Sequence, residues 1–179
     1  HTWEFKVPGI PTTMFWNYLV AEMDGHKTGP AWDLNPDYQR GHVWSKDQSE
    51  KFIGHILSGG EAPLIYLQRY DSDKNASSGS DYINLPIEVT DGQQRLKAIR
   101  AFIKGEIGAQ VWHDDAWHMY WYEDMSVVEK RDMNLSTEVM FVDLSKKDRL
   151  RFYLRLNSGT PHTEAELDKV REMLKNKGA

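Results

Sequence analysis

The chain has 179 residues, enough for one domain with a real core, and its 40% hydrophobic and 27% charged residues exclude a disordered or fibrous protein. It contains no cysteine, which excludes a disulfide scaffold, a cysteine nucleophile and a cysteinyl zinc site. The net charge of −5 does not favour general affinity for nucleic acid, and no apolar run is long enough to cross a membrane. With no visible signal peptide, the sequence predicts a cytoplasmic protein.

The first two predicted elements are helices. Thr12 or Thr13 is expected to cap a first helix over residues 12–24, which has one apolar face and ends at Gly25. The capping-box sequence Ser45-Lys-Asp-Gln48 predicts the start of a second helix, which ends at a pair of glycines.

The rest of the chain mixes strands with helices. The predicted elements are strands at 63–70, 85–90 and 138–144, a helix from Gly92 or Gln93 to about Lys104, a strand or hairpin at 111–122, and two C-terminal helices within 146–175. This order predicts an α+β fold in which helices surround a small mixed sheet. We expect a single domain over residues 1–179, with the first helix and the C-terminal helices packed on it.

The strongest candidate site is the run Asp91-Gly92-Gln93-Gln94-Arg95, where a predicted strand turns directly into a helix. Gly92 lets the backbone turn sharply, and the first turn of the helix offers N–H groups and partial positive charge to an anion. Arg95 adds a fork-shaped phosphate donor, and Asp91 is suited to hold Mg²⁺ or to orient an attacking oxygen. Gln93 and Gln94 supply neutral donors and acceptors. The alternative is an ordinary strand-to-helix turn with an aspartate N-cap.

A second candidate site is the loop ahead of the second helix, which concentrates Tyr38, Gln39, Arg40 and Trp44. Arg40 is predicted to lie against a phosphate, and Tyr38 or Trp44 to stack on a base. The alternative is that both aromatic side chains fasten the loop to the core while Arg40 makes a structural ion pair.

A third candidate lies between the two C-terminal helices. Arg155, Asn157, Ser158 and His162 are polar groups at two converging helix ends. The alternative is ordinary helix capping.

Two further patterns carry less information. His113 and His118 lie near Asp114 and Asp115, but their spacing fits no standard metal site and favours a surface hairpin. Basic residues also recur on two of the predicted helices. They are Lys97, Arg100 and Lys104 on one helix, and Lys146, Lys147, Arg149, Arg151 and Arg155 on the other. Such rows are usually solvated faces. If both helices flank the Asp91–Arg95 turn, they would form a local basic rim for DNA.

Together these segments resemble the DGQQR-motif family, found in the N-terminal domain of GmrSD-type restriction endonucleases and in related phage and phage-defence proteins. The similar runs are Y-Q-R-G-H-V-W-S at 38–45, F-I-G-H-I-L-S-G-G at 52–60, P-L-I-Y at 63–66, D-G-Q-Q-R-L-K-A-I at 91–99 and L-R-L-N-S-G-T at 154–160. The resemblance implies a ParB/sulfiredoxin-like fold and a place in a bacterial or phage-infected cell.

The resemblance also implies nucleotide chemistry with an NTP, ATP first, and Mg²⁺. Carried over by position, the catalytic residues are Asp91, Gln94 and Arg95, the metal ligand is Asp91, and the phosphate-binding residues are Gly92, Gln93, Gln39, Arg40 and Asn157. The implied activity is NTP hydrolysis or phosphoryl transfer, on or in response to DNA, including a kinase acting on modified DNA bases. The alternatives are a nucleotide- or DNA-binding sensor without turnover and a DNA-nicking endonuclease. The histidine-rich nuclease motif of the family's C-terminal half is absent from this sequence, which favours phosphoryl transfer or hydrolysis.

Overall fold

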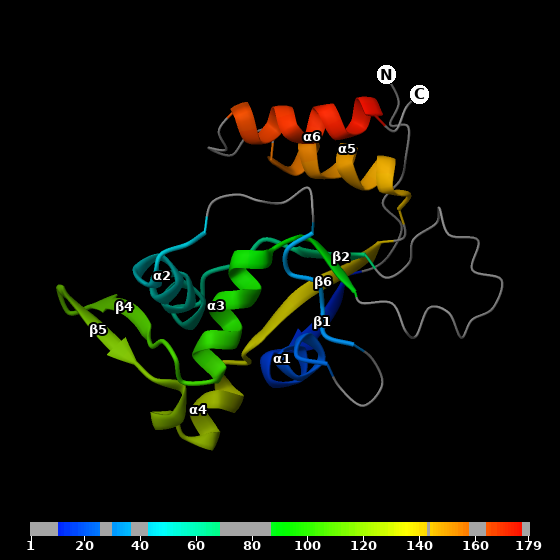
Figure 1. Cartoon of the computed structure of the whole chain (residues 1–179). Helices are drawn as coiled ribbons and strands as arrows, with labels where there is room; N and C mark the ends of the chain where they lie inside the picture. Colours follow the sequence, from blue (N-terminus) through cyan, green and yellow to red (C-terminus); the bar gives the residue numbers. More distant parts are fainter. Residues whose placement is uncertain are drawn as a thin grey trace.

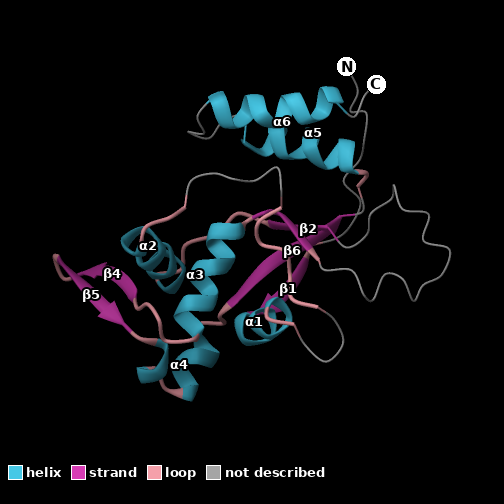
Figure 2. Cartoon of the chain, in the orientation of Figure 1, coloured by secondary structure: helices cyan, strands magenta, loops and turns pink. Residues whose placement is uncertain are grey.

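The computed structural model describes residues 11–25, 30–36, 43–68, 87–142, 144–157 and 164–176. In this part of the chain, six α-helices and one short 3-10 helix accompany a four-stranded and a two-stranded sheet (Figures 1 and 2). The predicted α+β class is therefore confirmed. A ParB/sulfiredoxin-like topology and a single domain over 1–179 stay predictions. None of the helices in the described ranges is long and apolar enough to cross a membrane.

The four-stranded sheet has the order β1-β6-β2-β3. β1 (Thr12–Phe15) pairs antiparallel with β6 (Ser136–Val142), and β6 pairs parallel with β2 (Ile65–Gln68). β3 (Glu88–Asp91) pairs antiparallel with β2, across an irregularity between Tyr66 and Leu67. The residue that opens the candidate turn, Asp91, therefore lies opposite Tyr66, near the start of β2.

The two faces of the sheet carry different cores, because alternate residues of a strand point to opposite sides. One face packs against α1 (Trp16–Met23), α2 (Lys46–Leu57) and α3 (Gln93–Ile103). This main core takes Ile65, Leu67, Val89 and Val139 from the strands. On the other face, Tyr66, Met140 and Val142 pack with Phe152 of α5 (Lys146–Asn157).

The N-terminal prediction is partly wrong. Residues 12–15, expected as the first turn of a helix, form strand β1, and α1 begins at Trp16 without a side-chain cap. Thr12 and Thr13 are β-branched and pair with Val139 and Glu138 of β6, a long-range contact that no local pattern reveals.

The predicted hairpin at 111–122 is confirmed as β4 (Ala109–His113) and β5 (Ala116–Tyr120). Asp114 and Asp115 form its two-residue turn with φ of 51° and 58°, as a type I′ turn requires. β4 packs directly on α2, where Gly54 leaves no room for a side chain beside the carbonyl of Gln110.

One helix was not predicted from the sequence. A 3-10 helix (Tyr122–Asp124) leads into α4 (Val127–Asp132), which begins at a capping box formed by Ser126 and Glu129. The pattern Ser-x-x-Glu at 126–129 is the signal that would have revealed it.

The two C-terminal helices are confirmed as α5 and α6 (Glu164–Asn176), which pack together through Leu150, Tyr153 and Val170. Figure 1 shows them side by side, at the opposite end of the molecule from the β4–β5 hairpin. The chain enters α5 from the sheet at Leu144, whose backbone N–H and C=O both bond to the buried amide of Gln68. Ser158 and His162, two of the polar residues of the third candidate site, lie outside the described residues.

Candidate functional site

The turn between β3 and α3 is built on Gly92. Its φ of 111° is a left-handed conformation that L side chains rarely adopt, and an added Cβ would lie 2.9 Å from Cγ1 of Ile65. Gly92, and not Asp91, is the N-cap residue, so the alternative of an aspartate N-cap is wrong. Gly92 has no side chain to cap the helix, and the first turn of α3 contains no acidic residue. The positive end of the helix is therefore not neutralised by its own first turn.

Arg95 and Asp91 form an ion pair on the inner side of this turn. Nη2 of Arg95 lies 2.8 Å from Oδ2 of Asp91, and the two side chains are 10% and 26% exposed. Nη1 of Arg95 donates to the backbone carbonyls of Pro63 and Leu64, the residues that lead into β2. Arg95 thus ties the turn to the neighbouring strand and fixes the Asp91 carboxylate.

The two glutamines of the motif hold the turn to its surroundings. Nε2 of Gln93 donates to the carbonyl of Val89, at 2.6 Å, within β3. Oε1 of Gln94 accepts from the backbone N–H of Trp44, at 3.1 Å, just ahead of α2. Trp44, which was predicted to stack on a base, therefore contacts the Asp91–Arg95 turn through its backbone.

The ring of Trp44 packs on the main core. It lies 5.2 Å from the ring of Phe52, centroid to centroid, and is half-buried. This matches the alternative in which Trp44 fastens the loop. Its role in base stacking stays a prediction.

Three predicted site residues, Tyr38, Gln39 and Arg40, lie outside the described residues. The described residues on both sides of them bond to α3. Asn35 accepts from Nζ of Lys97 at 3.0 Å, and Trp44 donates to Gln94.

Asn157 is the last residue of α5, and its side chain is not among those described. The helix passes along β3: Arg149 pairs with Glu88 at the start of that strand, with Nη1 and Oε2 2.8 Å apart. Phe152 then meets Tyr66, which lies opposite Asp91, with ring centroids 4.8 Å apart. The contribution of Asn157 to the site stays a prediction.

A comparison with protein-family models identifies the family of this chain. Residues 21–176 match the family model described as "GmrSD restriction endonuclease, N-terminal domain". The chain belongs to this family. The match includes the Asp91–Arg95 turn and every described element from α2 onward, and it confirms the resemblance drawn from the DGQQR motif. No curated protein and no solved structure matches the chain.

The basic rim predicted for this GmrSD-type domain is largely paired. On α3, Lys104 and Arg100 both approach Asp24 after α1, with N···O distances of 2.6 Å and 3.6 Å. On α5, Arg149 is buried against Glu88, and Arg151 lies 3.3 Å from Asp148. Arg100 and Lys104 therefore join α3 to the end of α1, and Arg149 joins α5 to β3. A local basic rim that binds DNA stays a prediction.

The two histidines of the hairpin contact each other and not a metal cluster. The rings of His113 and His118 stack with centroids 3.7 Å apart. The two ring nitrogens of His113 lie 3.0 Å from Oδ2 of Asp114 and 2.7 Å from the hydroxyl of Tyr120. Within the described ranges, no three histidine, aspartate or glutamate side chains gather as a metal site would require.

Asp91 is the one candidate ligand for Mg²⁺ that the sequence singled out. Mg²⁺ keeps several waters in proteins and takes one or two carboxylates together with substrate phosphates. A partly exposed carboxylate at the positive end of a helix fits that pattern, and Asp91 is 26% exposed. The residues present are thus compatible with Mg²⁺ delivered with a nucleotide, which would supply charge neutralisation at the phosphates.

Proposed function

We propose that this domain binds a nucleoside triphosphate at the N-terminus of α3 and couples its hydrolysis or phosphoryl transfer to a restriction-type reaction on DNA. The observation that carries the proposal is the turn at Gly92. A left-handed glycine ends a strand and opens an eleven-residue helix whose first turn has no acidic residue. Such a turn presents backbone N–H groups and partial positive charge to a phosphate.

The side chains around the turn divide into two kinds. Asp91 keeps part of its carboxylate exposed, so it is the candidate for binding Mg²⁺ or for orienting the attacking oxygen. Gln94 lies in the first turn of α3, and we propose that it orients the substrate. Arg95 is buried and already donates to Asp91, Pro63 and Leu64, so we assign it the role of positioning the carboxylate.

Residues of the neighbouring segments would complete the site. Gln39 and Arg40 would contact the phosphates, as would Asn157. Tyr38 would stack on the base, and Trp44 would hold the loop in place through its bond to Gln94.

Support for DNA as a partner comes from the family match. The family model names a restriction endonuclease, so DNA is the expected partner of the complete enzyme. The chain has a net charge of −5, so we expect its contact with DNA to be local and to weaken with added salt in proportion to the number of phosphates it neutralises.

A second candidate function is DNA nicking by this domain, and membership of a restriction endonuclease family favours it. A third candidate function is a sensor that binds nucleotide or DNA without turnover.

The test compares two aspartates that pair with arginines of the same helix. Asp91→Asn removes the charge at the N-terminal end of α3, whereas Asp24→Asn removes it beside the C-terminal end. With ATP, CTP or GTP and Mg²⁺, phosphate release and transfer to duplex DNA are measured for both variants. We expect Asp91→Asn to lower turnover by about a hundredfold or more, and Asp24→Asn to change it by less than about twofold.

The outcomes separate the candidate functions. Turnover that is equally unaffected in both variants contradicts the site assignment. Nucleotide binding without product selects the sensor. Plasmid nicking that requires a divalent metal and is lost in Asp91→Asn selects the nuclease, and intact plasmid with Mg²⁺ or Mn²⁺ excludes it.

A further inference from the structure

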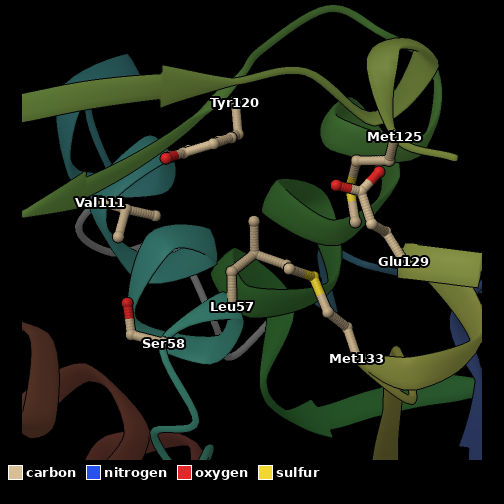
Figure 3. Close-up of a pocket in the computed structure, with 7 residues that line it drawn as sticks. All are labelled: Leu57, Ser58, Val111, Tyr120, Met125, Glu129 and Met133. Atoms are coloured by element: carbon tan, nitrogen blue, oxygen red, sulfur yellow. The ribbon is translucent and has the colours of Figure 1, made fainter. Parts of the chain in front are cut away.

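A cavity of about 210 Å³ opens where the C-terminal end of α2, the hairpin and α4 meet (Figure 3). Its lining residues are Leu57, Ser58, Val111, Tyr120, Met125, Glu129 and Met133. A closed apolar cavity of roughly 150 Å³ is enough to take a benzene ring, so this one has room for a large apolar side chain. None of its lining residues belongs to the candidate nucleotide site.

One wall of the cavity comes from α4 and the residues that flank it. Glu129 belongs to the helix, Met125 comes just before its N-cap residue Ser126, and Met133 is its C-cap residue. Figure 3 shows these side chains facing Leu57 and Tyr120 from the opposite wall. Met133 is 45% exposed and Tyr120 is 41% exposed, so the cavity opens at the surface. Exposed apolar surface around a hollow is typical of an interaction site.

Glu129 is the one charged residue among those that line the cavity. Its Oε2 accepts a hydrogen bond of 2.7 Å from the backbone N–H of Ser126, and its own N–H donates to Oγ of Ser126. The bonds to Ser126 lower the pKa of Glu129, so the carboxylate is ionised at neutral pH. An apolar cavity with a fixed carboxylate at its wall suits an apolar group next to a cation.

The surroundings of the cavity are also acidic. The segment 120–133 contains four carboxylates, at Glu123, Asp124, Glu129 and Asp132, and two basic residues, at Lys130 and Arg131. Arg131 is paired with Asp132 at 3.0 Å, and Lys130 lies over the ring of Tyr122 at 4.1 Å. This surface would repel DNA, and it would repel the same surface of a second copy of the chain.

We propose that the cavity face, defined by Leu57, Val111, Tyr120, Met125, Glu129 and Met133, is a docking surface for a basic segment of a protein partner. The segment places one large apolar side chain in the cavity and a lysine or arginine against Glu129. Apolar contact supplies the affinity, and the acidic surroundings select a cationic partner. This inference does not depend on nucleotide binding.

Signals of the methionine methyl groups allow binding at the cavity face to be measured. Met125 and Met133 line the cavity, whereas Met14 and Met23 are buried in the main core, so ¹³C-methyl NMR of the full chain reports on both regions. The probes are synthetic amphipathic peptides of about four helical turns. One carries leucines on one face and lysines on the other, one has the lysines replaced by glutamates, and one is a scrambled form of the basic peptide.

We expect the basic amphipathic peptide to shift the Met125 and Met133 signals and to leave Met14 and Met23 unchanged. The acidic and scrambled peptides should shift none of them. Equal binding of the basic and acidic peptides, or no shift with any of the three, would overturn the proposal. Shifts that appear with rising protein concentration alone would mean that a second copy occupies the surface, and they would also overturn it.

Two variants with a matched control localise the effect. Glu129→Gln keeps the capping-box geometry but removes the charge, and we expect it to weaken binding by about three- to tenfold. Tyr120→Ser should weaken binding at least as much, whereas Tyr18→Ser on α1, where the tyrosine is 58% exposed, should leave it unchanged. Equal effects of the two tyrosine variants would show that binding occurs elsewhere and would contradict the proposal.

Discussion

The two ends of helix α3 carry the same kinds of residue in different surroundings. A left-handed glycine stands at each end, Gly92 with φ of 111° and Gly105 with φ of 74°. At Gly92 an added Cβ would meet Ile65 at 2.9 Å, whereas at Gly105 nothing lies within 4 Å. The same backbone conformation is therefore enclosed by the core at one end and open to solvent at the other.

The ion pairs at the two ends differ in the same way. Arg95 is 10% exposed and shared between Asp91 and two backbone carbonyls, whereas Lys104 is 43% exposed and pairs with the surface residue Asp24. Lys104 lies where a cation stabilises the helix dipole, but Arg95 lies in the first turn, where a cation opposes it. Asp91 compensates that charge. A residue that breaks a local rule and needs a buried partner is typical of a functional site, and this difference singles out the N-terminal end.

The largest expected contrast is between the two glycines. Gly92→Ala combines left-handed strain with overpacking against Ile65 and should lower the free energy of unfolding by about 2–4 kcal/mol. Gly105→Ala carries only the strain and should cost about 1 kcal/mol. Urea unfolding followed by circular dichroism measures both. Equal costs would mean that the N-terminal turn is not packed as described.

The arginines should give the next contrast. Arg95→Ala removes the hydrogen bonds to Pro63 and Leu64 and leaves Asp91 partly buried without its partner, so we expect a loss of about 2–3 kcal/mol. Arg100→Ala, at a pair that is about one-third exposed, should cost less than about 1 kcal/mol. The same unfolding measurement applies, and a cost for Arg100→Ala that matches that of Arg95→Ala would contradict the assigned difference in burial.

The smallest effect should be at Lys104. Lys104→Ala removes a surface ion pair with Asp24 and should cost about 0.5 kcal/mol at low salt. Because exposed charges are screened, that cost should vanish near 1 M NaCl, whereas the cost of Arg95→Ala should persist. Unfolding midpoints compared at low and high salt test this. If the cost of Arg95→Ala also fell with salt, the Arg95–Asp91 ion pair would be exposed to solvent.

Local signals predicted much of this structure, and long-range contacts account for what they missed. The capping box at Ser45 and the glycine turn at Gly92 were both read correctly, because their chemistry lies within a few residues. Two partners of Arg95, the backbone carbonyls of Pro63 and Leu64, lie about thirty residues away in sequence. The motif alone therefore does not predict that Arg95 ties the turn to β2. The sequence also predicts a helix where Thr12 begins strand β1, because the strand partner, β6, lies far along the chain.

The turn that carries the candidate site could be located from the sequence, but the contacts within it could not. The motif places Asp91 and Arg95 at the start of a helix, yet only the structure shows the pair bonded to each other at 2.8 Å. Likewise, nothing in the basic row of α3 itself reveals that Asp24, just after α1, pairs with Arg100 and Lys104.

The central claim is that the N-terminal end of α3, and not its C-terminal end, receives the phosphates of a nucleotide. The most direct measurement is a titration of the ¹⁵N-labelled full chain with ATP and Mg²⁺, followed by backbone amide NMR. Binding at the turn predicts shifts of the Gly92, Gln93 and Gln94 amides, with Gly105 unchanged. Shifts confined to other parts of the chain, or no shift with ATP, CTP or GTP, would contradict the claim.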